Sequence, residues 1–468
     1  MNDQGYDLIV IGGGEAGISA ALRASALGAR TAMVNREPEL GGGCVQTGTL
    51  PSKTLSNAAH FLENLKKGKR YGIVVDENAK ADYRAILESR HKTTMCEVGV
   101  LATLIRKNKI ETVTGEASFT GPKALRVKLL DGTVREMGAP KIVIATGSRP
   151  ATLPGFDWNR TTILSPDDLT AMDAVPRRFL IVGAGVIGCE IAFIFRSLGS
   201  EVFLVEKLER ALPGQDHDMA AVITREFKKK GIKLLTGQGL ERIEPAGGGA
   251  VRAVLAGGES LEVDRIMIGV GRRPNTEALN LGAAGIEAGG HGEIPVDEHM
   301  ETSAPGIYAA GDVLARIMLS SMAVVEARVA AENALGVRSR MDYSCAPWGI
   351  YTDPEIGSVG LTEDEAREKG VAVVIGECGY NDLVRGCLDG SVVGLFKFLF
   401  EAGSHRLVGA HIVGQDASEI IHFAALAVKM GARAEDLKDM VYNHPTISEG
   451  FGKAAADALN KLGSDQAI

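Results

Sequence analysis

A repeated unit constrains this chain more than any other feature of its sequence. Residues 8–35, LIVIGGGEAGISAALRASALGARTAMVN, align without gaps on residues 179–206, FLIVGAGVIGCEIAFIFRSLGSEVFLVE, at a constant offset of 171. Each copy consists of an apolar strand, a G-x-G-x-x-G turn, an apolar helix that stops at Leu-Gly, and a second strand. In this context the glycines let a pyrophosphate approach the N-terminus of the helix. The repeat therefore predicts two similar α/β units, each with a dinucleotide site.

The glycines of the two turns are the first candidate binding residues. A duplicated scaffold in which one copy has lost its ligand is the alternative, but it leaves two intact glycine sets unexplained. A second pair of segments, IVIATGSRP at 142–150 and IMIGVGRRP at 266–274, shares the pattern I-x-I-x-x-G-x-R-P and closes each unit. The candidates from these segments are Gly12, Gly14, Gly17, Thr146 and Gly147 in the first unit and Gly183, Gly185, Gly188, Gly271 and Arg272 in the second.

The residue that ends the second strand distinguishes the two copies. In the second copy it is Glu206, whose carboxylate can bind both hydroxyls of an adenosine ribose and would repel a 2′-phosphate, so this site is expected to prefer NADH. Lys207 and Arg210 lie close enough in sequence to attract a phosphate, so NADPH is disfavoured rather than excluded. The first copy has Asn35, an amide that binds hydroxyls without the strength of a charge. Glu37 is the alternative ribose ligand there.

Composition and charge narrow the class of partner. The 51 basic and 59 acidic residues give a net charge of −8, which offers no basic surface for nucleic acid or an anionic membrane and favours small-molecule partners. No apolar run approaches the ~20 residues needed to span a bilayer, and no secretion signal is recognisable, so a cytoplasmic protein is expected. The six cysteines contain no C-x-x-C pair, so neither a metal site nor a disulfide framework is predicted.

Together these motifs resemble the pyridine nucleotide-disulfide oxidoreductases, the family of dihydrolipoamide dehydrogenase, glutathione reductase and mercuric reductase. ETSAPGIYAAGD at 301–312 is similar to the family's second flavin motif, and APWGIYTDPEIGSVGLTEDEA at 346–366 to the opening of its dimerisation domain. NHPTISEG at 443–450 is similar to its C-terminal histidine–glutamate motif. The resemblance implies FAD in the first site, with Gly311 and Asp312 among its ligands, a nicotinamide nucleotide in the second site, and a homodimer.

The resemblance also implies an order of domains. Residues 1–150 form the first part of an FAD-binding domain, 151–274 an inserted NAD(P)-binding domain, and 275–342 the completion of the FAD domain. Residues 343–468 form a dimerisation domain. The expected fold is therefore α/β, with two Rossmann-like domains and a C-terminal α+β domain.

The stretch GGGCVQTGTLPSKTL at 41–55 departs from the disulfide-reducing members of the family. Those members carry two cysteines in a C-x4-C arrangement, of which the first exchanges with substrate and the second lies against the flavin. Here the first is Cys44, but Thr49 stands in the second position, and a hydroxyl forms no disulfide. The stretch looks instead like the soluble, Si-specific pyridine nucleotide transhydrogenases, which have threonine at this place. Its Gly43 is a further candidate cofactor contact.

Two further pairs of candidate catalytic residues follow from the resemblance. Lys53 matches the family lysine, and Glu190 matches the glutamate that pairs with it beside flavin N5, where a cation stabilises negative charge. His444 and Glu449 match the acid–base pair that disulfide reductases supply across the dimer interface. The transhydrogenase pattern has an aromatic residue at the histidine position, so an interface hydrogen-bonding role is the alternative for His444.

Three functions fit these residues. The first is a flavin-dependent transhydrogenase that passes hydride between nicotinamide nucleotides in a ping-pong cycle. The second is an NADH reductase of a quinone or other diffusible acceptor, with His444 as the proton donor. The third is a nucleotide-binding flavoprotein without turnover, against which the retained Lys53 and Glu190 argue. A dihydrolipoamide dehydrogenase-like activity is disfavoured, because no thiol at position 49 could resolve a mixed disulfide on Cys44.

Overall fold

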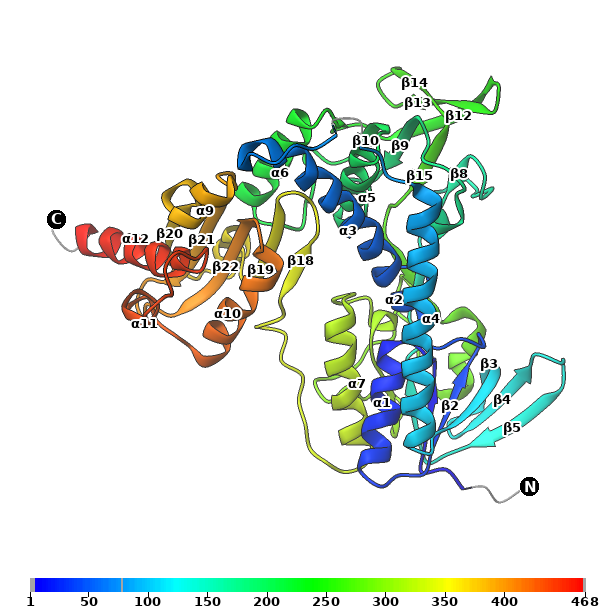
Figure 1. Ribbon diagram of the computed structural model, residues 1–468. Coiled ribbons are helices and arrows are strands. Elements are labelled where there is room, and N and C mark those ends of the chain that lie inside the picture. The colour runs from blue at the N-terminus through cyan, green and yellow to red at the C-terminus, as the bar shows by residue number, and fades with distance from the viewer. Residues whose placement is uncertain (1–4, 77–78, 466–468) are drawn as a thin grey trace.

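Three large β-sheets and their helices divide the molecule into three lobes (Figure 1). The computed structural model describes residues 5–76 and 79–465. Within this part of the chain, every helix is too short or too polar to cross a lipid bilayer.

The first sheet contains the first copy of the repeat. Strand β1 (Leu8–Ile11) pairs in parallel with β2 (Thr31–Asn35) and with β6 (Lys141–Ile144), and helix α1 (Glu15–Ala26) joins β1 to β2. The four residues of β1 are all buried, as expected for a strand covered on both faces. The sheet order is β17 (Ile307–Ala309), β6, β1, β2, β3 (Glu111–Gly121), β4 (Ala124–Leu129) and β5 (Val134–Gly138).

The second sheet repeats this arrangement. Strand β9 (Arg178–Val182) pairs in parallel with β10 (Glu201–Val205) and β15 (Arg265–Ile268), and α5 (Val186–Ser197) joins β9 to β10. The predicted pair of Rossmann-like units is thus confirmed. The other elements of this lobe are β8 (Ile163–Leu164), α6 (His217–Lys229), β11 (Lys233–Leu235) and the antiparallel strands β12 (Leu240–Gly247), β13 (Ala250–Leu255) and β14 (Ser260–Val263).

The two I-x-I-x-x-G-x-R-P segments meet where the chain passes between these units. Their last three residues form β7 (Ser148–Pro150) and β16 (Arg272–Pro274), which pair antiparallel. Arg149 lies opposite Arg273 at the centre of this ribbon. The chain therefore enters and leaves the second unit through adjacent strands.

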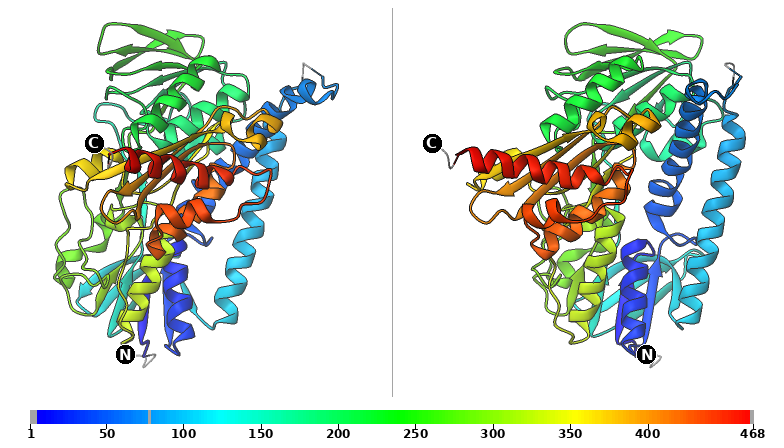
Figure 2. Two further views of the ribbon diagram at one scale, coloured as in Figure 1. Left: turned by 90° about the vertical axis from the view of Figure 1, so that its left-hand side faces the viewer. Right: turned by 60° about the vertical axis from the view of Figure 1, so that its left-hand side comes forward.

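The C-terminal lobe is an antiparallel sheet with helices, which confirms the predicted α+β architecture. Helix α10 packs on β19 and β22, while α12 packs on β20 and β21 (Figure 2). Its elements are β18 (Trp348–Ile350), β19 (Glu355–Gly360), α8 (Glu363–Glu368), β20 (Val373–Gly379), α9 (Val384–Asp389), β21 (Leu395–Glu401), β22 (Leu407–Gly414), α10 (Ala417–Met430), α11 (Ala434–Asp439) and α12 (Glu449–Asp465).

Long helices connect the lobes and carry the predicted active-site stretch. The short α2 (Gly42–Gln46) leads into α3 (Thr49–Lys66), which lies beside α4 (Tyr83–Lys107) and against α5 of the second unit (Figures 1 and 2). Helix α7 (Ser320–Ala334) packs along α1. The domain limits at 150, 274 and 342 remain predictions.

Candidate functional site

The first and third glycines of each turn are required by close backbone contacts. A Cβ atom at Gly12 would lie 2.1 Å from a neighbouring carbonyl oxygen, and one at Gly17 only 1.9 Å from such an oxygen. In the second unit the corresponding distances are 2.5 Å at Gly183 and 1.8 Å at Gly188. These four positions exclude side chains because strand, turn and helix pack against one another.

The middle glycines instead leave open space before a helix. Gly14 is the N-cap of α1 and Gly185 the N-cap of α5, and neither helix has a side chain capping its first N–H groups. A Cβ at Gly185 would meet no atom within 4 Å, and one at Gly14 would meet its nearest atom at 3.7 Å. An uncapped helix N-terminus facing open space fits the pyrophosphate of a dinucleotide.

Equivalent hydrogen bonds tie the strand-end residues to the two glycine turns. The Gly13 N–H donates to Asn35 Oδ1 at 3.0 Å, and the Ala184 N–H donates to Glu206 Oε2 at 2.7 Å. Both donors and both acceptors are related by the offset of 171 residues that relates the two copies. The repeat is therefore conserved in its polar contacts as well as in its topology.

The two strand-end residues differ in what they can still bind. Asn35 Nδ2 donates to the carbonyl oxygens of Glu37 and Glu39, at 2.6 and 3.1 Å, so the local turn uses both amide hydrogens. Glu206 accepts a second N–H, from Leu208 at 2.9 Å, and its carboxylate keeps further lone pairs for ribose hydroxyls. The geometry is suited to ribose recognition in the second unit more than in the first.

Of the two basic residues near Glu206 in sequence, Arg210 is engaged by main-chain carbonyls of its own loop. Its guanidinium donates to three main-chain carbonyls, those of Leu212, Pro213 and Gln215, at 2.8 to 3.0 Å. Lys207 is exposed. Of these two residues, Lys207 is therefore the one whose charge is available to a 2′-phosphate.

Lys53 and Glu190 form an ion pair between the first and second units. Lys53 Nζ lies 2.6 Å from Glu190 Oε2, and the buried Glu190 also accepts the Tyr351 N–H through Oε1 at 2.9 Å. The Lys53 ammonium lies 4.2 Å from the centre of the Tyr351 ring, within the range of a cation–π contact. Residues from α3, α5 and the start of the C-terminal lobe are thus brought together at one point.

Cys44 lies in a small polar cluster with Thr49. Ser320, Thr49 and Glu15 lie close enough to its thiol to affect the pKa of that thiol, and Ser320 and Glu15 are the first residues of helices α7 and α1. Burial raises the pKa of Cys44, and the charge of Glu15 raises it further, against the hydrogen bonds of Ser320 and Thr49. At neutral pH Cys44 is therefore a protonated thiol rather than a nucleophilic thiolate.

All six cysteines lie in the described part of the chain, and all are free thiols. Cys189, the other cysteine beside a glycine turn, is fully buried, with its Sγ 3.4 Å from the Ala184 oxygen. Burial raises its pKa far above the usual range. In the same described part, no group of three or more His, Cys, Asp or Glu side chains is arranged to hold a metal ion.

A second polar cluster surrounds Asp312. Ser148 Oγ donates to Asp312 Oδ2 at 2.6 Å, and Arg272 Nε donates to Ser148 Oγ at 2.7 Å. A Cβ at Gly43 would lie 3.8 Å from Arg272 Nη2, so the turn before Cys44 lies next to this guanidinium. The predicted flavin motif, the closing segment of the second unit and the Cys44 stretch thus converge.

The strands β7 and β16, through which the chain enters and leaves the second unit, are flanked by hydrogen bonds of Thr146, Gly147 and Gly271. Thr146 Oγ1 donates to the Asn275 carbonyl at 2.8 Å, and the Gly147 carbonyl accepts the Asn275 N–H at 2.9 Å. The Gly271 carbonyl accepts the Ala151 N–H at 2.9 Å. Their contacts in this structure position the backbone around the β7–β16 ribbon.

His444 and Glu449 form a separate pair at the start of α12. His444 Nδ1 lies 2.9 Å from Glu449 Oε1, and the Thr446 N–H donates to Glu449 Oε2 at 3.0 Å. These hydrogen bonds lower the pKa of Glu449, which stays ionised and orients the ring. The His444 side chain is 62% exposed, and within the described residues no hydrogen bond or ion pair links it to Lys53 or Cys44.

Sequence reasoning missed Glu15, Ser320 and Tyr351. Glu15 follows the middle glycine of the first turn, where an acidic residue next to a pyrophosphate site is a recognisable signal. Tyr351 lies inside the stretch that resembles the dimerisation domain, but only the folded chain brings its ring to Lys53. Ser320 carries no pattern that marks it.

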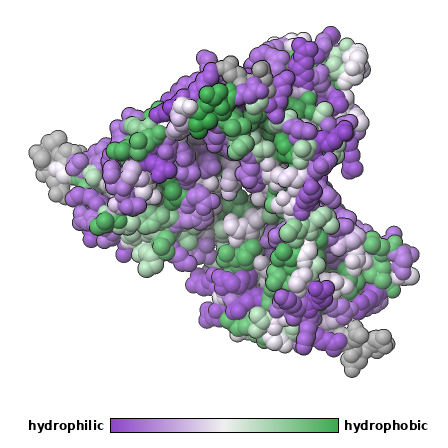
Figure 3. All heavy atoms as spheres, in the orientation of Figure 1, coloured by the Kyte–Doolittle hydropathy of each residue, from purple (hydrophilic) through white to green (hydrophobic). Residues whose placement is uncertain are grey.

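Apolar side chains are exposed on the C-terminal lobe. Leu426 and Met430 on α10 are 56% and 75% exposed, and Met440 and Val441 beyond α11 are 43% and 91% exposed. Figure 3 shows hydrophobic side chains gathered on the lower edge of this lobe. Such a group of exposed apolar residues is typical of a surface that another chain covers.

The sequence pattern of the pyridine nucleotide-disulphide oxidoreductases matches residues 6–327, and that of their dimerisation domain matches residues 346–455. The chain belongs to this family, whose members bind FAD and NAD(P), and it is a flavin-dependent oxidoreductase.

Two kinds of relative share nearly the whole chain. Dihydrolipoyl dehydrogenase of Thermus scotoductus is 38% identical over 460 residues, which cover 97% of this chain and 98% of that protein. The soluble pyridine nucleotide transhydrogenase of Mycobacterium bovis is 33% identical over 463 residues, with 98% of both chains covered. Overall identity therefore does not separate a disulfide reductase from a transhydrogenase.

Solved structures show the same architecture. LpdA of Mycobacterium tuberculosis superposes with a TM-score of 0.89 at 26% identity, over 96% of this chain and 99% of that one. The HOCl-induced flavoprotein disulfide reductase RclA of Escherichia coli has a TM-score of 0.87 at 25% identity, over 97% and 99% of the chains.

Proposed function

We propose that this chain is an FAD-dependent NAD(P)H oxidoreductase without a redox-active disulfide and that it transfers hydride between pyridine nucleotides. The observation that carries the proposal is the side chain at position 49. A threonine hydroxyl lies there beside the Cys44 thiol, and neither group can form a disulfide with the other. Electrons that a nucleotide donates to the flavin then have no disulfide between positions 44 and 49 to reduce.

The chain's own residues fit the two nucleotides. The open space before α1 would take the FAD pyrophosphate, with Gly14 beside it and Asp312 as a further ligand. The corresponding space before α5, with Gly185 and Glu206, would take NAD(H). FAD, when bound, supplies the chemistry of accepting a hydride from one nicotinamide and passing it to another.

Lys53 and Glu190 are the proposed catalytic pair. The lysine brings a positive charge to a largely enclosed place, and the glutamate holds that charge in position through a 2.6 Å contact. Such a preorganised cation stabilises negative charge that develops on a neighbouring ring system. Tyr351 limits the movement of the ammonium from the other side.

NADH is the proposed main nucleotide, with NADPH as a weaker one. Glu206 would repel a 2′-phosphate, and Arg210 is engaged by the carbonyls of its own loop. This preference limits, but does not prevent, hydride exchange between NADPH and NAD.

The test is anaerobic turnover with NADPH as donor and a spectrally distinct NAD analogue as acceptor, with quinones as alternative acceptors. Transhydrogenation faster than quinone reduction is the expected result. Quinone reduction without measurable formation of the reduced analogue would contradict the proposal.

Reduction of a quinone or another diffusible acceptor is the second candidate, favoured by the His444–Glu449 pair. An ionised Glu449 holds His444 Nδ1, and the exposed imidazole keeps Nε2 as the second nitrogen that an acid–base group requires. Transfer of hydride to a nicotinamide consumes no proton, whereas reduction of a quinone does.

A homodimer is proposed to complete the site. The match to the dimerisation domain supports it, and the exposed apolar residues of α10 offer a surface for a second copy. His444, which pairs with Glu449 but has no hydrogen bond or ion pair with Lys53 or Cys44 of its own chain, would then serve the site of the partner.

A further inference from the structure

The loop from Glu206 to Gln215 corresponds to the Cys44 stretch of the first unit. In the first unit the Gly41 N–H donates to the Gly13 carbonyl at 2.8 Å. In the second the Leu212 N–H donates to the Ala184 carbonyl, also at 2.8 Å. The offset is again 171 residues, so this nucleotide loop (206–215) and the Cys44 stretch are equivalent parts of the repeat.

The nucleotide loop is bound to its glycine turn at two points. Ala184 donates its N–H to Glu206 and accepts the Leu212 N–H through its carbonyl, so both polar groups of this turn residue face the loop. The Arg210 guanidinium joins three carbonyls within the loop. The position of the Glu206 carboxylate therefore depends on the course of the whole loop.

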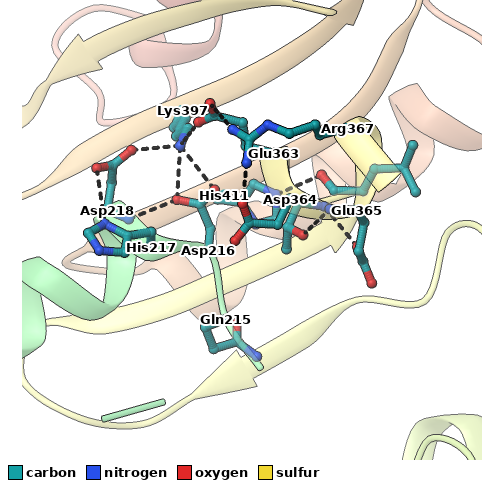
Figure 4. A network of polar contacts seen from close by, with 12 residues as sticks. Gln215, Asp216, His217, Asp218, Glu363, Asp364, Glu365, Arg367, Lys397 and His411 are labelled. Carbon is teal, nitrogen blue, oxygen red and sulfur yellow. Dashed lines mark hydrogen bonds and ion pairs between the residues drawn. The ribbon is translucent and has the colours of Figure 1, made fainter. Parts of the chain in front are cut away.

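The far end of the loop is fixed by a lysine of the C-terminal lobe. Lys397 on β21 has a side chain that is only 2% exposed, and its Nζ lies 3.0 Å from Asp216 Oδ2 and 2.6 Å from Asp218 Oδ2 (Figure 4). Glu363 of α8 is a third partner at 2.9 Å. Burial by itself would lower the pKa of Lys397, but these three carboxylates raise it, so the ammonium stays charged.

A second contact joins the same two parts. Ser358 Oγ on β19 donates to Gln215 Oε1 at 3.1 Å, and both side chains are buried. The neighbouring His411 lies on β22, where its Nε2 is 2.9 Å from the Leu361 oxygen, and burial lowers its pKa. His411 is therefore neutral, which leaves Lys397 as the buried cation that faces Asp216.

We infer that Lys397 is a positioning residue for the nicotinamide nucleotide: by holding Asp216 and Asp218 from the C-terminal lobe, it sets the nucleotide loop and the Glu206 carboxylate that binds the adenosine ribose. This inference rests on the proposed assignment of the second site, but not on the electron acceptor. It makes nucleotide affinity dependent on the lobe that forms the dimer.

The test is calorimetric titration of the FAD-loaded protein with ADP-ribose, which carries the adenosine half of the nucleotide and undergoes no redox reaction. Lys397→Met leaves Asp216 buried without a cation and is expected to weaken ADP-ribose binding by about tenfold or more. FAD content and the visible spectrum should not change, and KM for NADH should rise more than kcat falls.

Matched variants test whether the loss of affinity comes from the missing cation at position 397 or from a general effect of removing a lysine. Lys397→Arg should restore much of the affinity, and Lys233→Met, which removes an exposed lysine paired with Glu201, should leave it unchanged. The milder Ser358→Ala removes only the second contact and should weaken binding about twofold to fivefold.

Unchanged ADP-ribose affinity in a folded Lys397→Met protein would overturn the inference. Should that protein fail to fold, Ser358→Ala decides in the same way, because unchanged affinity there would also overturn it. A wild-type protein that does not bind ADP-ribose would instead contradict the assignment of the second site.

Discussion

Thr49 is the first residue of α3, and its hydroxyl contacts the Cys44 thiol. The helix presents this side chain one turn before Lys53, at the position where the family resemblance leads us to expect the second cysteine of a disulfide reductase. On the proposed function, the side chain at position 49 therefore decides whether a subunit stores two electrons or four.

Thr49→Cys should create a reducible disulfide with Cys44. Anaerobic titration of the wild type with dithionite is expected to end at two electrons per FAD, and that of the variant at four, because a disulfide takes up two more. Thr49→Ser is the matched control and should stay at two. Four electrons in the wild type would show that another pair of cysteines had taken over.

Glu15→Gln should make Cys44 more reactive. Burial and the Glu15 charge both disfavour the negative thiolate, so alkylation of Cys44 should require a higher pH than that of a thiol without these surroundings. Removing the charge lowers the pKa of Cys44 and moves its alkylation profile to lower pH. Mass spectrometry of iodoacetamide-treated protein measures this, with the exposed Cys96 as internal reference. An unshifted profile would mean that burial alone controls the thiol.

His444→Ala should slow the reduction of acceptors that take up a proton more than the reduction of acceptors that do not. A positioned general acid contributes about 10²–10⁴-fold, so quinone reduction should fall by a factor in this range. Transhydrogenation should stay within a few-fold of the wild type. Steady-state rates with both acceptors provide the comparison, and Glu449→Gln should act in the same direction through the ring it orients. Loss of transhydrogenation in a folded, FAD-loaded dimer would contradict this role.

At the scale of secondary-structure elements, the Cys44 stretch and the nucleotide loop (206–215) are equivalent parts of the repeat that lead to different contacts. Gly41 and Leu212 occupy the same place, and both have left-handed backbones, with φ of 101° and 49°. A left-handed leucine costs about 1–3 kcal/mol, which its buried side chain and the hydrogen bond to Ala184 offset. The first loop leads to Cys44. The second leads to Asp216, whose carboxylate forms an ion pair with Lys397 of the C-terminal lobe.

Glu206→Gln should reduce the proposed preference of the second site for NADH over NADPH. The amide keeps a similar shape and can still accept one of the two N–H groups, but it no longer repels a 2′-phosphate. The ratio of kcat/KM for NADH and NADPH should fall by about tenfold, which corresponds to ~1.4 kcal/mol. An unchanged ratio would indicate that Lys207 or the shape of the site governs the choice.

Much of this architecture could be predicted from the sequence, because glycine turns and buried strands are local patterns. The proximity of Lys53 to Glu190 followed from motif context and is seen as a 2.6 Å contact, while their catalytic role remains a prediction. The direction of Arg210 could not be predicted, because closeness in sequence does not determine where a long side chain points. The contact of Tyr351 with Glu190 and that of Lys397 with Asp216 join segments more than 150 residues apart, and no local pattern encodes them.

At the scale of the whole molecule, His444 has no hydrogen bond or ion pair with Lys53 in its own chain among the described residues. Whether His444 acts in the site of the partner chain can therefore be tested with mixed dimers. Co-expression of Lys53→Met and His444→Ala chains gives mixed dimers in which one site has both wild-type residues, provided that His444 acts across the interface. Proton-coupled activity should then return to as much as about half of the wild-type value per mixed dimer, although each homodimer is impaired. Different tags on the two chains allow the mixed dimer to be purified and its quinone reductase activity to be measured. No recovery of activity would place His444 in the site of its own chain.

The return of β17 to the first sheet has a consequence for synthesis on the ribosome. The strands of the second parallel sheet are all complete once Ile268 has been made, whereas the first sheet lacks β17 and the cover of α7 until residues 307–334 emerge. The apolar β6 meanwhile presents an unpaired edge to other nascent chains and to chaperones. The sheet whose first strand is translated earliest is thus the sheet whose last strand is made later.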